Sequence, residues 1–305
     1  MTSDRRAPSL ARRHPVALIW LGMLTYSTAP VLVVSSMVDG ATFSMMRLLL
    51  GVPIVALITI TFRGERKSPF PGKARVWIVS AGAAFGGHQL CFMLAVNATS
   101  VTDVVLMNAL APVVVMLLAA PMFGERTSTT FRLWVGVAIA GSMIVTLGGA
   151  TGPEGNPAGM ALAGVNVMFF SLFYMCSKAA RPHVDVWPLL FAVMVIATLV
   201  VGAFFVGTGR SLAIATEYDW LLATAVAAGP GAFGHFFMTW PLARLNANIA
   251  PVVRLLQPVS AGGLAWAVLG QGVTNSQLVG GVVTAAGILG VLGVLPPRPK
   301  VYVGS

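Results

Sequence analysis

The chain has 305 residues, of which 57% are hydrophobic and 9% are charged, and its formal net charge is +10. Soluble globular proteins carry about 25% charged residues, so the composition excludes an ordinary water-soluble domain. A mean hydropathy of +0.85 indicates that lipid surrounds most of this protein.

Apolar runs long enough to cross a bilayer follow one another along the chain. A helix needs about 20 apolar residues to cross about 30 Å of hydrocarbon, and charged or turn-forming residues divide the chain into ten such runs. The predicted spans are 15–37, 41–62, 76–97, 101–122 and 133–149, followed by 158–178, 188–208, 220–241, 249–269 and 277–295. The sequence therefore predicts an all-α integral membrane protein with ten transmembrane helices and short tails at 1–14 and 296–305.

The distribution of basic residues gives the predicted topology. With the N-terminus in the cytoplasm, 16 of the 19 Lys and Arg residues fall in cytoplasmic segments, Arg210 falls outside, and Arg47 and Arg254 fall within spans. Because Lys and Arg collect on the cytoplasmic side of membrane proteins, we expect both termini in the cytoplasm and the protein in the inner (plasma) membrane. The basic excess reports topology, so we expect no nucleic-acid partner.

The two halves of the chain repeat each other. The segment L-M-N-A-L-A-P ending at Pro112 resembles V-V-R-L-L-Q-P ending at Pro258, and Gly124 and Gly270 follow them at the same spacing. The first repeat covers 15–149 and the second 158–295, with five spans each. An odd number of spans gives the two copies opposite orientations, and such inverted repeats are typical of secondary transporters with a substrate site near the midplane.

These features resemble the drug/metabolite transporter superfamily, in particular its ten-helix group with two EamA domains. The resemblance covers about residues 15–295 and rests on Arg47 in M-M-R-L-L-L, the stretch from Leu94-Ala95 to Ala111-Pro112, Gly124-Glu125-Arg126, and the glycine-rich fifth span with its counterparts. It implies transport of amino acids, amines, vitamins or other small metabolites. A small-molecule substrate and the lipid bilayer are thus the expected partners.

Five ionisable side chains fall within predicted spans: Arg47, His88, Asp103, His235 and Arg254. Each costs about 2.5–3.5 kcal/mol to insert, so each is a candidate for function. Arg47 and Asp103 either neutralise each other or, for Arg47, extend to the outer interface. Near the midplane, His88 and His235 either exchange protons or bind a neighbouring helix. Asp103, His88 and His235 are therefore the candidates for proton coupling.

Pro112 and Pro258 give the main backbone argument for a cavity. A proline leaves the carbonyl four residues earlier without its helical donor, and in lipid that carbonyl needs another partner or a wet cavity. Here the carbonyls belong to Asn108 and Arg254, with Gln257 beside the second kink. The pattern indicates a central cavity lined by the fourth and ninth spans; the alternative is that the prolines only bend helices and the amides bridge neighbours.

Three aromatic residues fall inside or near the ends of spans: Tyr26, Tyr174 and Trp240. They either form walls of a substrate pocket or belong to interfacial belts and packing. The spacing of Gly82 and Gly86 permits the close approach of another helix, so we expect the face of the third span near His88 to pack tightly.

The sequence holds no nucleotide or metalloprotease motif, so we expect no cofactor, no metal and no ATP-driven step. The intramembrane charges of Arg47, Arg254 and Asp103 add to +1, which favours an anionic substrate group. We therefore predict a secondary transporter, working by alternating access, that exports an amino acid or related carboxylated compound.

The alternative within transport is a broad-specificity exporter of cationic or aromatic compounds with Asp103 as the cation partner. A membrane-embedded enzyme acting on lipid intermediates is a third hypothesis, but it needs a cluster of catalytic groups at the interface. The acidic residues expected outside are widely scattered instead: Asp39, Glu154, Glu217 and Asp219.

Overall fold

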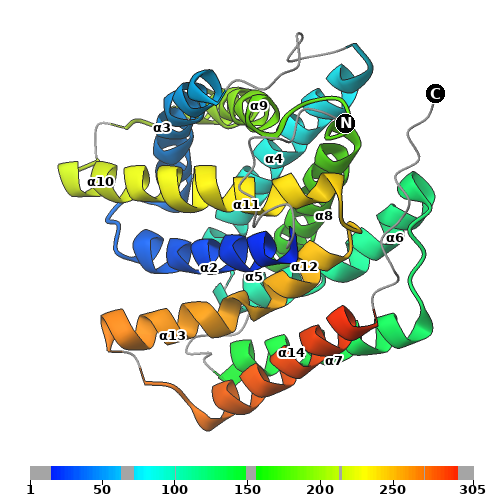
Figure 1. Cartoon of the computed structure of the whole chain (residues 1–305). Helices are drawn as coiled ribbons and strands as arrows, with labels where there is room; N and C mark the ends of the chain where they lie inside the picture. Colours follow the sequence, from blue (N-terminus) through cyan, green and yellow to red (C-terminus); the bar gives the residue numbers. More distant parts are fainter. Residues whose placement is uncertain are drawn as a thin grey trace.

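A computed structural model describes residues 15–62, 72–99, 101–148, 156–212, 215–270 and 272–294. The regular secondary structure of these residues is entirely helical (Figure 1). The predicted tails at 1–14 and 296–305 lie outside the described residues.

The described residues of the first half form six helices. They are α2 (Pro15–Val34), α3 (Gly40–Thr61), α4 (Gly72–Ala98), α5 (Val101–Asn108), α6 (Ala111–Phe123) and α7 (Thr129–Gly148). Together, α5 and α6 form the predicted fourth span, which a two-residue turn at Ala109 and Leu110 interrupts. A side chain caps α3, because Asp39 accepts hydrogen bonds from the first backbone amides of that helix.

The second half begins with two unbroken helices, α8 (Pro157–Ala180) and α9 (Val186–Gly207). Its third crossing changes helix type along its length: α10 (Glu217–Val226), the π-helix η1 (Ala227–Gly234), α11 (His235–Thr239) and the 3₁₀ helix η2 (Trp240–Ala243). The fourth crossing is divided into α12 (Ile249–Val253), the 3₁₀ segment η3 (Arg254–Leu256) and α13 (Gln257–Leu269), and α14 (Asn275–Gly293) follows.

Nine helical stretches of the described chain are long and apolar enough to cross a membrane. The predicted span at 249–269 is not among them, and in the structure it consists of α12, η3 and α13. Its residues still continue as helical segments in the expected place. The protein is thus an all-helical membrane protein, and its described residues form ten helical crossings, of which nine are candidate spans.

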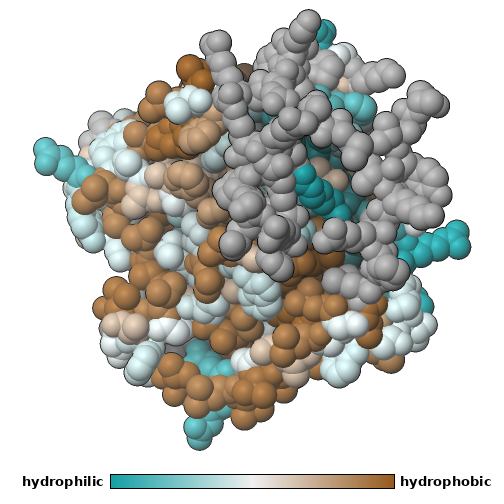
Figure 2. Space-filling model, in the orientation of Figure 1, coloured by the Kyte–Doolittle hydropathy of each residue, from teal (hydrophilic) through white to brown (hydrophobic). Residues whose placement is uncertain are grey.

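Large apolar side chains cover much of the outer surface, as the brown areas of Figure 2 show. Leu57, Leu199 and Leu221 are each at least 65% exposed. A water-soluble protein of this size rarely exposes such a continuous apolar surface. The surface therefore fits a lipid environment.

Helix pairing relates the two repeats. The third span, α4, packs against α8 and α9, and the eighth crossing, from α10 to η2, packs in the same way against α2 and α3. Second spans α3 and α9 pack against each other, as do fifth spans α7 and α14, which lie side by side in Figure 1. The third crossing of each repeat thus packs against the first two crossings of the other repeat, as expected for two repeats related by a two-fold axis. Because each repeat has five crossings, the two repeats have opposite orientations.

Glycines allow two of these helix pairs to approach closely. A Cβ atom at Gly141 of α7 would overlap the backbone of Thr284 in α14, and one at Gly287 would overlap the backbone of Ala138. Small residues of this kind replace the hydrophobic effect as the basis of helix association in lipid. This seam holds the fifth spans together.

Close approach is also present at Gly82 and Gly86, as predicted. A Cβ atom at Gly82 would lie 2.6 Å from Cβ of Ile196, and one at Gly86 would lie 2.7 Å from Cβ of Val200. These contacts fix α4 against α9, so His88, two residues after Gly86, is held near the middle of the bundle.

Candidate substrate-binding site

Two helix breaks mark corresponding places in the two repeats. In the first, α5 ends at Asn108, and Pro112 lies in the first turn of α6. In the second, Arg254 begins η3, and Pro258 lies in the first turn of α13. Because a proline in the first turn lacks only an amide hydrogen that would be unpaired anyway, each break is compatible with a regular helix beyond it. Asn108 and Arg254 therefore stand where the helical hydrogen bonding is interrupted.

The guanidinium group of Arg254 is held by neutral partners. Its Nε donates a hydrogen bond to Oε1 of Gln257 at 3.1 Å. Its Cζ lies 4.0 Å from the centre of the Phe170 ring and 5.9 Å from that of Tyr26, within the range of cation–π attraction. The positive charge is thus oriented by an amide and aromatic rings.

Gln257, at the start of α13, connects the ninth crossing to α2, the first crossing. Its Nε2 donates a hydrogen bond to the backbone carbonyl of Tyr26 at 3.4 Å. Pro30 lies four residues after Tyr26 inside α2 and has no amide hydrogen to give to that carbonyl. Gln257 therefore supplies the donor that Pro30 removes.

Tyr26 also contacts the eighth crossing through its hydroxyl. That hydroxyl lies 2.7 Å from Nδ1 of His235, in hydrogen-bonding distance. His235 is the first residue after the π-helix, and its ring packs edge-on against Phe85 and Phe173. The imidazole is buried between aromatic rings and is reached by one phenol.

His88 belongs to a second polar chain. Its Nδ1 lies 2.5 Å from Oδ1 of Asn166, and Nδ2 of Asn166 donates to Oδ1 of Asn108 at 2.9 Å. Because an amide oxygen only accepts hydrogen bonds, Nδ1 of His88 carries a hydrogen in this arrangement. The chain joins α4, α8 and the break between α5 and α6.

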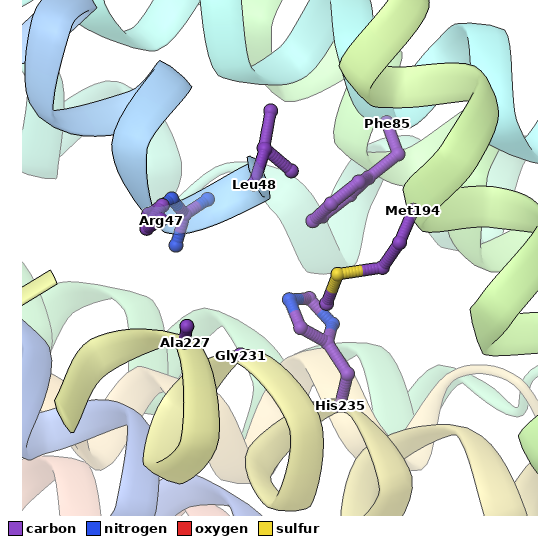
Figure 3. Close-up of a pocket in the computed structure, with 7 residues that line it drawn as sticks. All are labelled: Arg47, Leu48, Phe85, Met194, Ala227, Gly231 and His235. Atoms are coloured by element: carbon purple, nitrogen blue, oxygen red, sulfur yellow. The ribbon is translucent and has the colours of Figure 1, made fainter. Parts of the chain in front are cut away.

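Arg47 lines a small pocket in the interior (Figure 3). The other lining residues are Leu48, Phe85, Met194, Ala227, Gly231 and His235. Its Nε is buried and has no hydrogen-bond partner among the described residues. The pocket holds about 10 Å³, roughly the room that one water molecule needs, so a metabolite enters only if the helices move apart.

The π-helix η1 forms one wall of this pocket through Ala227 and Gly231. Side chains are not tolerated at Gly231, because a Cβ atom there would lie 2.9 Å from the carbonyl oxygen of Val226. Single turns of π-helix are frequently found at functional sites. The wide turn and the missing side chain together leave backbone facing Arg47.

Acidic residues are absent from this central region of the described chain. Its six Asp and Glu residues all lie at or next to helix ends: Asp39, Asp103, Glu125, Asp185, Glu217 and Asp219. Asp103 accepts a hydrogen bond from Thr99 at 2.6 Å. Asp103 and Arg47 both lie in the described part of the chain, and they form no ion pair there. Neither Arg47 nor Arg254 has a carboxylate partner in the described ranges.

Two of the predicted aromatic residues lie in the central cluster. The Tyr174 ring packs 4.8 Å from that of Phe170, and its buried hydroxyl lies next to the hydroxyl of Tyr26. Trp240 lies elsewhere, in η2, where the guanidinium of Arg244 stacks 4.3 Å from its ring. The structure thus brings together Tyr26 and Tyr174 but places Trp240 beside a loop.

Asn166 and Phe170 were missed from sequence. Both lie on α8, four residues apart and therefore on one helix face. A signal for Asn166 existed, since it is an amide within an otherwise apolar run. Phe170 gave none, because its role depends on Arg254 lying over its ring.

An ion pair and hydrogen bonds, together called polar ties, join the repeats at one end of the bundle. Lys178 at the end of α8 forms an ion pair of 2.8 Å with Glu125, which follows α6. Nζ of Lys178 also donates to the carbonyl of Leu245 at 2.5 Å, and Glu125 accepts from the amide of Ala247 at 2.8 Å. We name these four residues the α6–α8 latch.

A second set of ties lies at the other end, where α2 meets α3. Arg210 forms an ion pair of 2.9 Å with Asp39. Burial raises the pKa of the Asp39 carboxyl, but hydrogen bonds from Thr42 and Ala41 and the charge of Arg210 outweigh it, so the pKa lies below its usual value. Asp219 accepts hydrogen bonds from Ser36 and the Met37 amide. The loop between α2 and α3 is thus bound to the first turn of α10 and to Arg210 in the segment before it.

Comparison with known proteins gives the family. The sequence profile of the EamA-like transporter family matches residues 15–147 and again 157–293. The chain belongs to the EamA-like transporter family. It is therefore a drug/metabolite transporter superfamily member with two EamA repeats, a multi-pass membrane transporter and not an enzyme.

Individual relatives agree with the EamA assignment. An uncharacterized transporter of Archaeoglobus fulgidus is 24% identical over 198 residues, which cover 65% of this chain and 69% of the relative. One protein with a solved crystal structure superimposes with a TM-score of 0.79 at 14% identity, covering 92% of this chain and 97% of that one. The second similarity is one of fold.

Proposed function

We propose that this EamA transporter exports a small carboxylated metabolite, an amino acid or a related compound, by alternating access to one central site. The observation that carries the proposal is the pair Arg47 and Arg254. Both are guanidinium groups in the middle of the bundle, and neither has a carboxylate partner in the described residues. An uncompensated buried charge is costly, and a bound carboxylate offsets that cost.

The groups around Arg254 suit a carboxylate. A guanidinium group binds both carboxylate oxygens through parallel N–H donors, and Gln257 already fixes the orientation of Arg254 through Nε. Asn108 stands at the corresponding break of the first repeat. We assign Arg254, Gln257 and Asn108 to the substrate site, with His88, Arg47, Tyr26 and Tyr174 around it.

Alternating access has a physical basis in the polar ties at the two ends of the bundle: the α6–α8 latch at one end and the contacts of Asp39 and Asp219 at the other. We place the α6–α8 latch on the cytoplasmic side, following the predicted topology with both termini in the cytoplasm and the protein in the inner membrane. Opening toward one side requires the ties on that side to break while the other set holds. Rocking of one repeat against the other then exposes Arg254 to one side at a time.

Proton coupling is the proposed energy source, with His88, His235 and Asp103 as candidates. His88 lies within hydrogen-bonding distance of Asn166 on another helix, and His235 within that distance of Tyr26, so a change of protonation would change a contact between helices. Carboxylate flux into acidified proteoliposomes that follows the pH gradient supports coupling. Indifference to the gradient makes the protein a facilitator.

The alternative, export of cationic or aromatic compounds through Asp103, has less support. Asp103 lies in the first turn of α5, about one and a half turns before Asn108. Its carboxylate is engaged by Thr99. A cation bound there would stand apart from the aromatic rings around Arg254.

A comparison of metabolites tests the proposed function. Cells that overproduce the protein are compared with cells that lack it, and the medium of each is measured. We expect overproducing cells to release a carboxylated compound, the variant R254Q to release none above background, and the control R132Q, which removes an exposed arginine at the start of α7, to behave as wild type. Selective release of a cation, lost in D103N and kept in R254Q, would overturn the proposal.

A further inference from the structure

We infer that the substrate carries two acidic groups, as a small dicarboxylate does, and that Arg254 and Arg47 each bind one of them. The inference rests on the proposed function and narrows it. It separates net anions from zwitterionic amino acids, which have one carboxylate and one ammonium group.

We call the two arginines that would bind the acidic groups the two poles of the site. The first pole is Arg254 in the second repeat. Phe170 covers its guanidinium group at 4.0 Å, and Gln257 accepts from Nε. The groups that the described structure places against it are neutral: the Gln257 amide, the Phe170 ring and the Tyr26 ring. The Tyr174 ring contacts Phe170, and its buried hydroxyl lies next to that of Tyr26 and within electrostatic reach of Arg254. A buried phenol next to an arginine is a second donor for an acidic group.

The second pole is Arg47 in the first repeat. It lines the pocket with His235, and its buried Nε has no partner in the described chain (Figure 3). An unsatisfied buried donor is costly in the absence of a ligand. The pocket wall at Gly231 carries no side chain, so the approach to Arg47 is not blocked from the π-helix.

Tyr26 connects the two poles. Its ring lies 5.9 Å from Cζ of Arg254, and its hydroxyl lies 2.7 Å from Nδ1 of His235. His235 in turn shares the pocket with Arg47. One ligand lying along the Tyr26 side chain would therefore reach from one arginine toward the other.

Charge balance decides between classes of substrate. A zwitterion leaves both arginine charges uncompensated, a monocarboxylate leaves one, and a dianion leaves none. An ammonium group would need a carboxylate or several carbonyl acceptors, and the described acidic residues all lie at helix ends. Since uncompensated charges are costly away from water, the dianion is favoured.

The test uses the full-length protein reconstituted in liposomes. Butyrate, alanine and the dicarboxylate series from oxalate to adipate compete against the exported compound, or stabilise the purified protein against heat where that compound is unknown. We expect the best dicarboxylate to bind at least tenfold more tightly than butyrate, and alanine to bind less tightly than either. The series also reports the separation of the poles, because affinity should peak at one chain length.

Variants assign the two poles. R47Q should weaken dicarboxylate binding at least tenfold more than it weakens butyrate binding, and R254Q should lose both. The R132Q control should keep the full preference. R47Q removes an unpaired buried charge, so its folding should be at least as stable as that of wild type, and the wild-type series alone tests the inference.

Two results would overturn the inference. Alanine or butyrate binding as tightly as every dicarboxylate is one, and equal loss of butyrate and dicarboxylate binding in R47Q is the other. Either leaves the proposed function intact if carboxylate binding still depends on Arg254. Absence of binding by all carboxylates overturns both proposals.

Discussion

Gln257 donates a hydrogen bond to the carbonyl of Tyr26, the carbonyl that Pro30 leaves without a helical donor. The same side chain accepts from Arg254. One amide therefore satisfies a gap in the first helix and orients a charge in the ninth. Changes at this residue should disturb stability and binding together.

Gln257→Leu should lower both stability and substrate affinity. It leaves the Tyr26 carbonyl unsatisfied and Nε of Arg254 without its acceptor, at a cost of about 1–3 kcal/mol for each buried group. Thermal unfolding in detergent and the KM for the exported compound measure the two effects. Gln277→Leu is a control for loss of a glutamine, because it changes only the exposed cap of α14. Wild-type KM in Gln257→Leu would mean that Arg254 needs no such partner.

Gln257→Glu should prevent carboxylate binding without removing either arginine. A carboxylate at this place pairs with Arg254 as a built-in competitor, and we expect transport to fall by at least tenfold while the protein remains folded. The pair of variants R254Q and Q257E should then look alike in flux assays. Retained transport in Q257E would remove Arg254 from the binding site.

Exchanging the two charged residues of the α6–α8 latch should not restore its function. Lys178 donates to the Leu245 carbonyl, and Glu125 accepts from the Ala247 amide, so exchanging the two side chains restores their ion pair but leaves these backbone groups unpaired. We expect E125K, K178E and the double variant all to increase labelling of a cysteine placed at Leu245. Full protection in the double variant would show that only the ion pair closes this end. Cys91 and Cys176 are replaced by alanine in all these proteins.

The tie between Asp39 and Arg210 should depend on pH in acid. The pKa of Asp39 lies below its usual value of about 3.9, so its contribution to stability is present above that value and is lost as the pH falls through the folded-state pKa. Melting temperatures should therefore fall more in wild type than in D39N between about pH 5 and pH 3. Equal slopes in the two proteins would show that Asp39 contributes no such stability.

Glycine replacements should separate the α7–α14 seam from the lipid-facing surface. Gly141→Leu overlaps the backbone of Thr284, whereas Gly136 on the same helix has no atom within 4 Å of an added Cβ. We expect Gly141→Leu to destabilise the protein by about 1–3 kcal/mol or more and Gly136→Leu to leave the melting temperature nearly unchanged. Similar melting temperatures for the two would contradict the seam.

The sequence predicted the order of the spans and the repeat because both depend on local composition. Lipid requires long apolar helices, and the matched segments around Pro112 and Pro258 lie in matched places. The kind of interruption was not predictable in the same way. The π-helix before His235 and the 3₁₀ segment at Arg254 depend on packing against other helices.

Contacts between distant residues limited what could be predicted of the site. Arg254, Gln257, His88 and Asn108 were singled out as polar groups in apolar runs, but nothing local pairs His88 with Asn166 or places Arg254 over Phe170. The suggested neutralisation of Arg47 by Asp103 depended only on similar depth in two spans, and depth does not fix which faces meet.

Flux through proteoliposomes measures whether Arg254 binds an acidic group of the substrate. Uptake of the exported carboxylate is measured for wild type, R254Q and R132Q at equal reconstituted amounts. We predict wild-type flux in R132Q and at least a hundredfold loss in R254Q. Unchanged KM and maximal rate in R254Q would show that Arg254 does not bind the substrate.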